Sequence, residues 1–209
     1  MIIESNLISA TGYHAIIGKA LDLQVKQYTE LWNEVQEFGA TTVGKCESDR
    51  WRLYFEKFGF RVDTSRLIIT VLTCSFLEAL ANFYIASKTD ADQFAVLEGA
   101  SILEKWVTIP RFYNPRYELP KDEQLYQDLK LVITSRNAIA HPKPLVVVDG
   151  ANVHKGNIPK KSADEHAFTL RSASLPMRLL KHLWKYDQSR ETNLLIFSCG
   201  YDLMEFNAD

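Results

Sequence analysis

The stretch RLIITVLTCSFLEALANFYIAS, residues 66–87, decides the fold of this 209-residue chain. It is apolar nearly all round, and its length favours a helix, although its β-branched start would also suit a strand. Glu78 and Asn82 lie within it and would be costly inside a bilayer, which argues against a membrane span. The stretch therefore predicts the central helix of a bundle, with an N-cap among residues 63–65.

The segments on either side of this stretch also carry helical patterns. Apolar residues recur at helical spacing over 15–38, and Gly39 is a natural stop. Gly59 is expected to end a short helix that Asp49 caps. Prolines at 110, 115 and 120 exclude regular helix between them. Further helices are predicted over residues 50–58, from Asp90 or Asp92 to 106, over 121–140, and over 175–186 with a proline in its first turn.

The pattern changes after Pro142. LVVVDGANVH, residues 145–154, has a β-branched run, an Asp-Gly turn and a second short run, which predicts a β-hairpin. Residues 156–161 are expected to be a loop, with order resuming at Ser162 or Asp164, and residues 193–206 suit either a helix or a strand. The prediction is an all-α domain: a helical bundle over 1–145, and a hairpin with a C-terminal helical appendage over 146–209 packed on the same domain.

Composition places the chain among globular proteins. A hydrophobic share of 46% is enough for a real core, and a charged share of 24% without long polar tracts excludes a disordered chain. Three cysteines, far apart and odd in number, form neither a zinc pattern nor a disulfide framework, which favours a reducing, intracellular setting. The first residues, MIIESNLISATG, lack the basic start of a signal peptide, so a cytoplasmic location is expected.

Charge is distributed unevenly along the chain. The net charge is −2, yet residues 136–190 hold ten Lys and Arg against four Asp and Glu, a local excess of about +6. This region would suit a polyanion, although solvated helix faces explain it equally well. Several kinds of site are excluded: there is no Gly-rich phosphate loop, no G-x-S-x-G elbow and no Cys or His cluster with zinc spacing. The remaining histidines (14, 154, 166 and 182) are interpreted as surface or core residues, and the tryptophans as core residues rather than as a platform for base stacking.

The stretch SRNAIAHPKP, residues 135–144, carries the candidate chemistry. Pro142 disfavours helical backbone at His141, so the helix is expected to end there, where its dipole attracts positive charge. Arg136 and His141 together suit a phosphate and a proton transfer. They differ by about 140° around the helix and about 7.5 Å along it, so a second copy of the motif is expected to complete the site. Asn137 lies near the face of His141 and is expected to orient it.

Arg136-Asn137-x3-His141 resembles the Arg-x4-6-His signature of the HEPN superfamily, in which a polar residue typically follows the arginine. FLEALAN, residues 76–82, is similar to a common HEPN helix pattern, and the resemblance covers roughly residues 60–145. It implies a small helical bundle that dimerises with its two motifs facing each other. Many members are metal-independent endoribonucleases in toxin–antitoxin, abortive-infection and CRISPR-linked defence, whereas others have lost catalysis and serve as binding modules.

The residues suit this chemistry, because RNA supplies its own nucleophile, the 2′-hydroxyl. We expect His141 to act as general acid or base and Arg136 to hold the phosphate, with Lys143 as an RNA contact. Glu78, an acid in an apolar helix, is a supporting candidate and a partner for Arg136, or else it lies on a solvent-facing strip. No metal or cofactor is expected. The leading prediction is a homodimeric endoribonuclease with an antitoxin or other protein partner and no membrane contact; the alternatives are a non-catalytic module that binds RNA, nucleotide or protein, and a helical scaffold.

Overall fold

The computed structural model describes residues 2–44, 46–141 and 158–200, and in these ranges the chain forms helices and no β-strand. The predicted all-α class is confirmed. The hairpin predicted over 145–154 lies outside the described residues.

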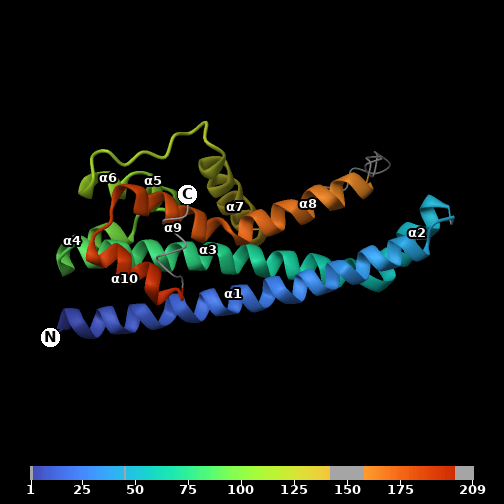
Figure 1. Ribbon diagram of the computed structural model, residues 1–209, viewed down its shortest axis with the longest axis horizontal. Helices are drawn as coiled ribbons and strands as arrows, with labels where there is room; N and C mark the ends of the chain where they lie inside the picture. Colours follow the sequence, from blue (N-terminus) through green and yellow to red (C-terminus); the bar gives the residue numbers. More distant parts are fainter. Residues whose placement is uncertain (1, 45, 142–157, 201–209) are drawn as a thin grey trace.

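Two long antiparallel helices form the frame of the molecule (Figure 1). α1 (Ile2–Thr41) runs beside α3 (Phe60–Lys88), so that the ring of His14 packs on Phe83 and Tyr28 contacts Arg66. A Cβ atom at Gly18 of α1 would lie 3.0 Å from the ring of Phe76, so glycine permits the close approach of the two helices. α3 thus takes the central position that its apolar sequence predicts.

The predicted breaks at Gly39 and Gly59 are both wrong. α1 continues through Gly39 to Thr41, and the chain turns at Gly44, whose φ of 103° suits glycine. α2 (Glu47–Tyr54) leads through a π-helical turn (Phe55–Gly59) directly into α3. Gly59 has helical φ and ψ, and the Phe55 ring fills the place of its absent side chain, so this glycine serves packing and does not end the helix. The proposed caps at 63–65 accordingly lie inside α3.

The middle of the chain forms shorter helices that follow its caps. Asp90 caps α4 (Ala91–Glu98) by accepting from the Gln93 amide at 2.8 Å, as predicted. The predicted continuation to 106 is interrupted by a turn, because Ser101 and Glu104 form a capping box that starts a new helix. The remaining helices of this region are α5 (Ile102–Val107), α6 (Ile109–Tyr113), which is one turn carrying Pro110, and α7 (Gln124–Ala140).

The C-terminal helices complete the same core. α8 (Ile158–Ala173) begins earlier than expected, so the predicted loop is wrong from Ile158 onward. α9 (Leu175–Tyr186) has the predicted bounds, and α10 (Arg190–Ser198) shows that the first part of the ambiguous segment is helical. Side chains of these helices join those of α1, α3 and α7 in one buried cluster, whose fully enclosed members include Leu77, Leu80, Leu129, Leu179 and Ile196. Each such side chain contributes roughly 1.5–3 kcal/mol.

The continuous helix from Glu47 to Lys88 is long and apolar enough to cross a membrane. Its most apolar window is 56% buried by the rest of the protein. Length and composition of this kind are shared by membrane spans and by the core helices of soluble proteins.

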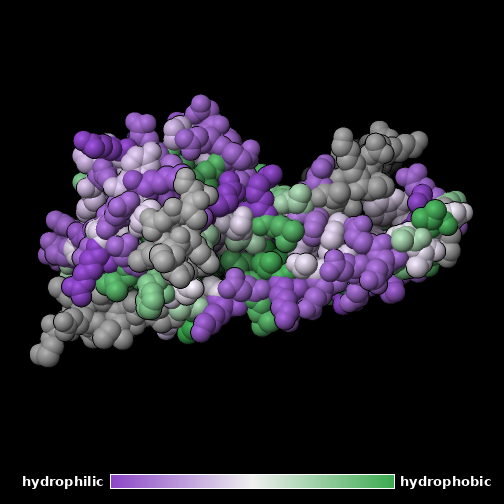
Figure 2. Space-filling model, in the orientation of Figure 1, coloured by the Kyte–Doolittle hydropathy of each residue, from purple (hydrophilic) through white to green (hydrophobic). Residues whose placement is uncertain are grey.

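The surface is largely polar, but hydrophobic side chains gather at mid-length along the course of α3 (Figure 2). Three aliphatic residues of α3 are substantially exposed within five positions: Leu67, Ile68 and Val71, at 46%, 40% and 40%. A stretch that is apolar all round predicts full burial, so this exposed face is a feature that the sequence alone does not reveal.

Candidate functional site

The candidate site lies at the C-terminal end of α7. The helix ends at Ala140, as predicted, and His141 is its C-cap residue with φ of −129° and ψ of 67°. The His141 backbone N–H still donates to the carbonyl of Asn137 at 2.9 Å, so the last turn of the helix is closed. The His141 side chain is exposed to solvent. A histidine on a rigid helix end, open to solvent, can exchange protons with a bound substrate.

Arg136 lies one turn earlier and is half-buried. Its Nη1 donates to the side-chain oxygen of Asn137 at 3.2 Å. Asn137 therefore contacts both candidate residues, through its side chain to Arg136 and through its backbone to His141. We expected the Asn137 side chain to orient the histidine, whereas it holds the guanidinium.

The Arg136 and His141 side chains stand five residues apart at the end of α7. Arg136 lies in α7 and His141 is its C-cap; helical geometry, which holds through Ala140, separates positions five residues apart by about 140°. Within the described part of the chain, no hydrogen bond joins their side chains. One copy of α7 therefore does not direct the two side chains to the same point.

Glu78 forms an ion pair with Lys105 of α5, whose Nζ lies 3.6 Å from the carboxylate. Lys105 is buried, and Glu78 is 44% exposed. Glu78 and Arg136 both influence the thiol of Cys74, so they lie in the same part of the structure. Burial raises the pKa of the Cys74 thiol to about 11; the charge of Arg136 opposes this rise, and the charge of Glu78 adds to it. The proposed partnership of Glu78 with Arg136 is therefore replaced by a pair with Lys105.

Part of the basic C-terminal region is used inside the fold. Asp128 of α7 is buried, and its carboxylate forms an ion pair with Arg171 at 3.0 Å and accepts a hydrogen bond from Arg178 at 2.7 Å. Gln124 donates to the same group at 2.8 Å. Two arginines of the basic region, in which a polyanion-binding surface was considered, therefore link α8 and α9 to α7, the helix that carries the candidate site.

The sequence did not predict a role for Lys105. Lysine is almost never buried unless it is paired, and the residues around Lys105 in the sequence give no sign of its partner. Among the described residues, no group of three His, Cys, Asp or Glu side chains is placed to hold a metal ion. Lys143, the expected RNA contact, lies outside the described residues.

No protein-family model, no curated protein and no solved structure matches this chain.

Proposed function

We propose that the chain is a metal-independent endoribonuclease of the HEPN type that acts as a homodimer. The observation that carries the proposal is the end of α7, where half-buried Arg136 and exposed His141 terminate one helix and Asn137 contacts both. A guanidinium binds a phosphate, and an accessible imidazole transfers protons near neutral pH. No other part of the described chain combines these two groups with the resemblance noted in the sequence.

The reaction follows from these two groups and the RNA itself. The 2′-oxygen attacks the adjacent phosphorus, the bond to the 5′-oxygen breaks, and a 2′,3′-cyclic phosphate forms. His141 takes the 2′-hydroxyl proton as a base and, as the imidazolium so formed, returns it to the leaving 5′-oxygen. Arg136 stabilises the negative charge that builds up on the phosphate oxygens in the transition state. Each site combines the Arg136 of one copy with the His141 of the other, so a dimer has two sites.

The exposed face of α3 supports a dimer. Leu67, Ile68 and Val71 are aliphatic, exposed and one to two turns from Cys74, whose thiol contacts the Val132 carbonyl of α7 at 3.7 Å. A second copy that covers this face would bring its own α7 toward the first. An authentic dimer of this kind should bury well over about 1,000 Å² in total.

A ribonuclease of this type acts inside a cell, which agrees with three free cysteines among the described residues. The proposed setting is cytoplasmic, in defence or in a toxin–antitoxin pair, with the antitoxin or another protein as the restraining partner. The alternative function is a non-catalytic HEPN-like module that binds RNA or nucleotide. The hydrogen bond from Arg136 to Asn137 favours this binding module, because an oriented guanidinium can bind a phosphate without His141.

The test is RNA cleavage by purified protein in EDTA, with single-stranded RNA and the matching DNA as substrates. The nuclease should cut RNA to 2′,3′-cyclic phosphate ends and leave DNA intact, because DNA lacks the nucleophile. Arg136→Ala and His141→Ala should each abolish cutting. The binding module predicts no cutting by the wild type and a loss of RNA affinity mainly in Arg136→Ala. A wild type that neither cuts nor binds any RNA in a broad panel would leave only the scaffold.

A further inference from the structure

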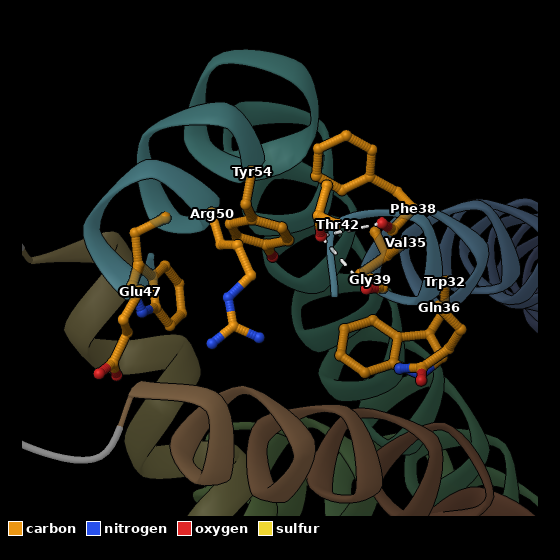
Figure 3. A pocket seen from close by; sticks show the side chains of 10 residues that line it. Trp32, Val35, Gln36, Phe38, Gly39, Thr42, Glu47, Arg50 and Tyr54 are labelled. Atoms are coloured by element: carbon orange, nitrogen blue, oxygen red, sulfur yellow. Dashed lines mark hydrogen bonds between the residues drawn. The ribbon is translucent and has the colours of Figure 1, made fainter. Parts of the chain in front are cut away.

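A cavity of about 370 Å³ lies between the C-terminal end of α1 and α2 (Figure 3). Aromatic and aliphatic side chains form its walls, among them Trp32, Val35, Trp51 and Tyr54. Its volume falls within the range of small-molecule sites. The cavity lies near one end of the long α1–α3 pair, away from the end of α7 (Figure 1). It is therefore separate from the proposed nuclease site.

The walls of the cavity are held in place by ring contacts and hydrogen bonds. Trp32 is buried and stacks on His166 of α8, with ring centroids 4.2 Å apart and planes 7° from parallel. Trp51 meets Tyr54 edge to face at 5.6 Å. The buried Thr42 hydroxyl hydrogen-bonds the carbonyls at the end of α1. The walls come from α1 and α2, with Trp32 supported from behind by α8, and they are preformed, so a ligand need not order them.

Two opposite charges line the same cavity without pairing. Glu47 and Arg50 lie three residues apart on α2, and both side chains are exposed. Within the described residues, no ion pair shorter than 4.0 Å involves either of them, whereas the neighbouring Arg52 pairs with Asp49 at 3.6 Å. Figure 3 shows the Arg50 guanidinium reaching into the open centre of the cavity, with the Glu47 carboxylate at the outer edge.

We propose that this cavity binds a small zwitterion with an aromatic side chain, the chemical class of the free aromatic amino acids. Arg50 would hold the carboxylate in a bidentate pair, Glu47 would hold the ammonium group, and the ring would enter the apolar part beside Trp32. The described lining carries one cation and one anion. A dianionic phosphate matches this lining poorly, because it would face Glu47 as well as Arg50.

The test is calorimetric titration of the full chain with L-tryptophan, L-tyrosine and L-phenylalanine. The matched ligands lack either the carboxylate (tryptamine, tyramine and phenethylamine) or the ammonium group (indole-3-propionate, 3-(4-hydroxyphenyl)propionate and 3-phenylpropionate), and AMP represents the phosphate class. At least one amino acid should bind, and its two truncated analogues should bind at least about tenfold more weakly, because each lacks one charge-assisted contact.

Matched variants assign the binding to this cavity. Arg50→Gln and Glu47→Gln should each weaken binding at least about tenfold, and Arg52→Gln, on the same helix but outside the cavity, should leave it unchanged. Gly39 lines the cavity, and a Cβ atom at this position would meet no atom within 4 Å, so Gly39→Leu should block the ligand while the helix remains intact.

Three results would overturn the proposal: no binding of any amino acid at millimolar concentration, tighter binding of AMP than of the amino acids, or binding that survives Arg50→Gln and Glu47→Gln. His141→Ala should leave the affinity for the amino acid unchanged. The ligand proposal and the nuclease proposal can therefore fail independently of each other.

Discussion

Lys105 is only 2% exposed, and its ammonium nitrogen lies 3.6 Å from the carboxylate of Glu78, which remains 44% exposed. The pair explains why an acid stands in the most apolar stretch of the chain: it neutralises a buried cation from the edge of the solvent. Because Glu78 and Arg136 both act on the Cys74 thiol, this pair also belongs to the surroundings of the candidate site.

Glu78→Gln should therefore lower the free energy of unfolding by about 1–2 kcal/mol, since Lys105 loses its counter-charge while Glu78 is already partly solvated. Urea denaturation measures the change. Lys105→Met is the matched variant and should cost less, because it leaves Glu78 free to hydrate. The double variant should recover most of the loss from Glu78→Gln; a double variant as unstable as the sum of both would contradict the pairing.

Asp128→Asn should be among the more damaging polar substitutions in the chain. The buried carboxylate forms ion pairs with Arg171 and Arg178, and a neutral amide leaves two guanidinium groups without their counter-charge. Because both arginines are partly exposed, we expect a loss of about 2–3 kcal/mol in the free energy of unfolding. Asp49→Asn, which affects an exposed pair with Arg52, should stay within about 0.5 kcal/mol. Equal effects of the two substitutions in thermal denaturation would refute this account of Asp128.

Asp187 should make stability depend on pH in the acid range. Burial opposes its ionisation, but hydrogen bonds from Ser189, Lys88 and Tyr84 outweigh burial and lower its pKa to about 2. A carboxyl whose pKa is depressed by folding adds stability above its unfolded pKa of about 3.9, and this share is lost as pH falls toward 2. Asp187→Asn should remove about 2 kcal/mol at neutral pH and flatten the curve of stability against pH between about 4 and 2. A variant curve parallel to the wild type would show that Asp187 is not responsible.

The exposed face of α3 should mediate self-association. Val71→Asp places a charge among Leu67 and Ile68 and should convert a dimer into a monomer of unchanged helicity. Val96→Asp on α4, where valine is 78% exposed, is the control and should leave the assembly intact. Analytical ultracentrifugation distinguishes the outcomes. A wild-type chain that sediments as a monomer at high concentration would exclude a composite site.

The sequence predicted the helical class and several helices well, because apolar spacing and caps are local signals. Asp90 caps its helix, and the ends of α7 and α9 fall at the predicted residues. Gly39 and Gly59 misled the prediction, since glycine marks both helix ends and positions of close packing. At Gly59 the deciding contact is the Phe55 ring, which only the fold provides.

The candidate site was predictable only in part. The sequence placed Arg136 and His141 at the end of one helix, and their divergence followed from helix geometry. The partner of Glu78 was not predictable, because Lys105 approaches from a separate helix. The cavity beside Trp32 was missed for a similar reason: Trp51 was interpreted as a core residue, whereas it lines a solvent-accessible cavity between two helices.

The most direct test of the composite nuclease site is complementation between Arg136→Ala and His141→Ala. Each variant alone should be inactive, because every site then lacks one group. A heterodimer that combines them keeps one intact pair, the arginine of one copy and the histidine of the other. Purified through two different tags, it should recover about half of the wild-type rate of RNA cleavage in EDTA. A heterodimer as inactive as its parents, beside an active wild type, would contradict the composite site; an inactive wild type would contradict the nuclease itself.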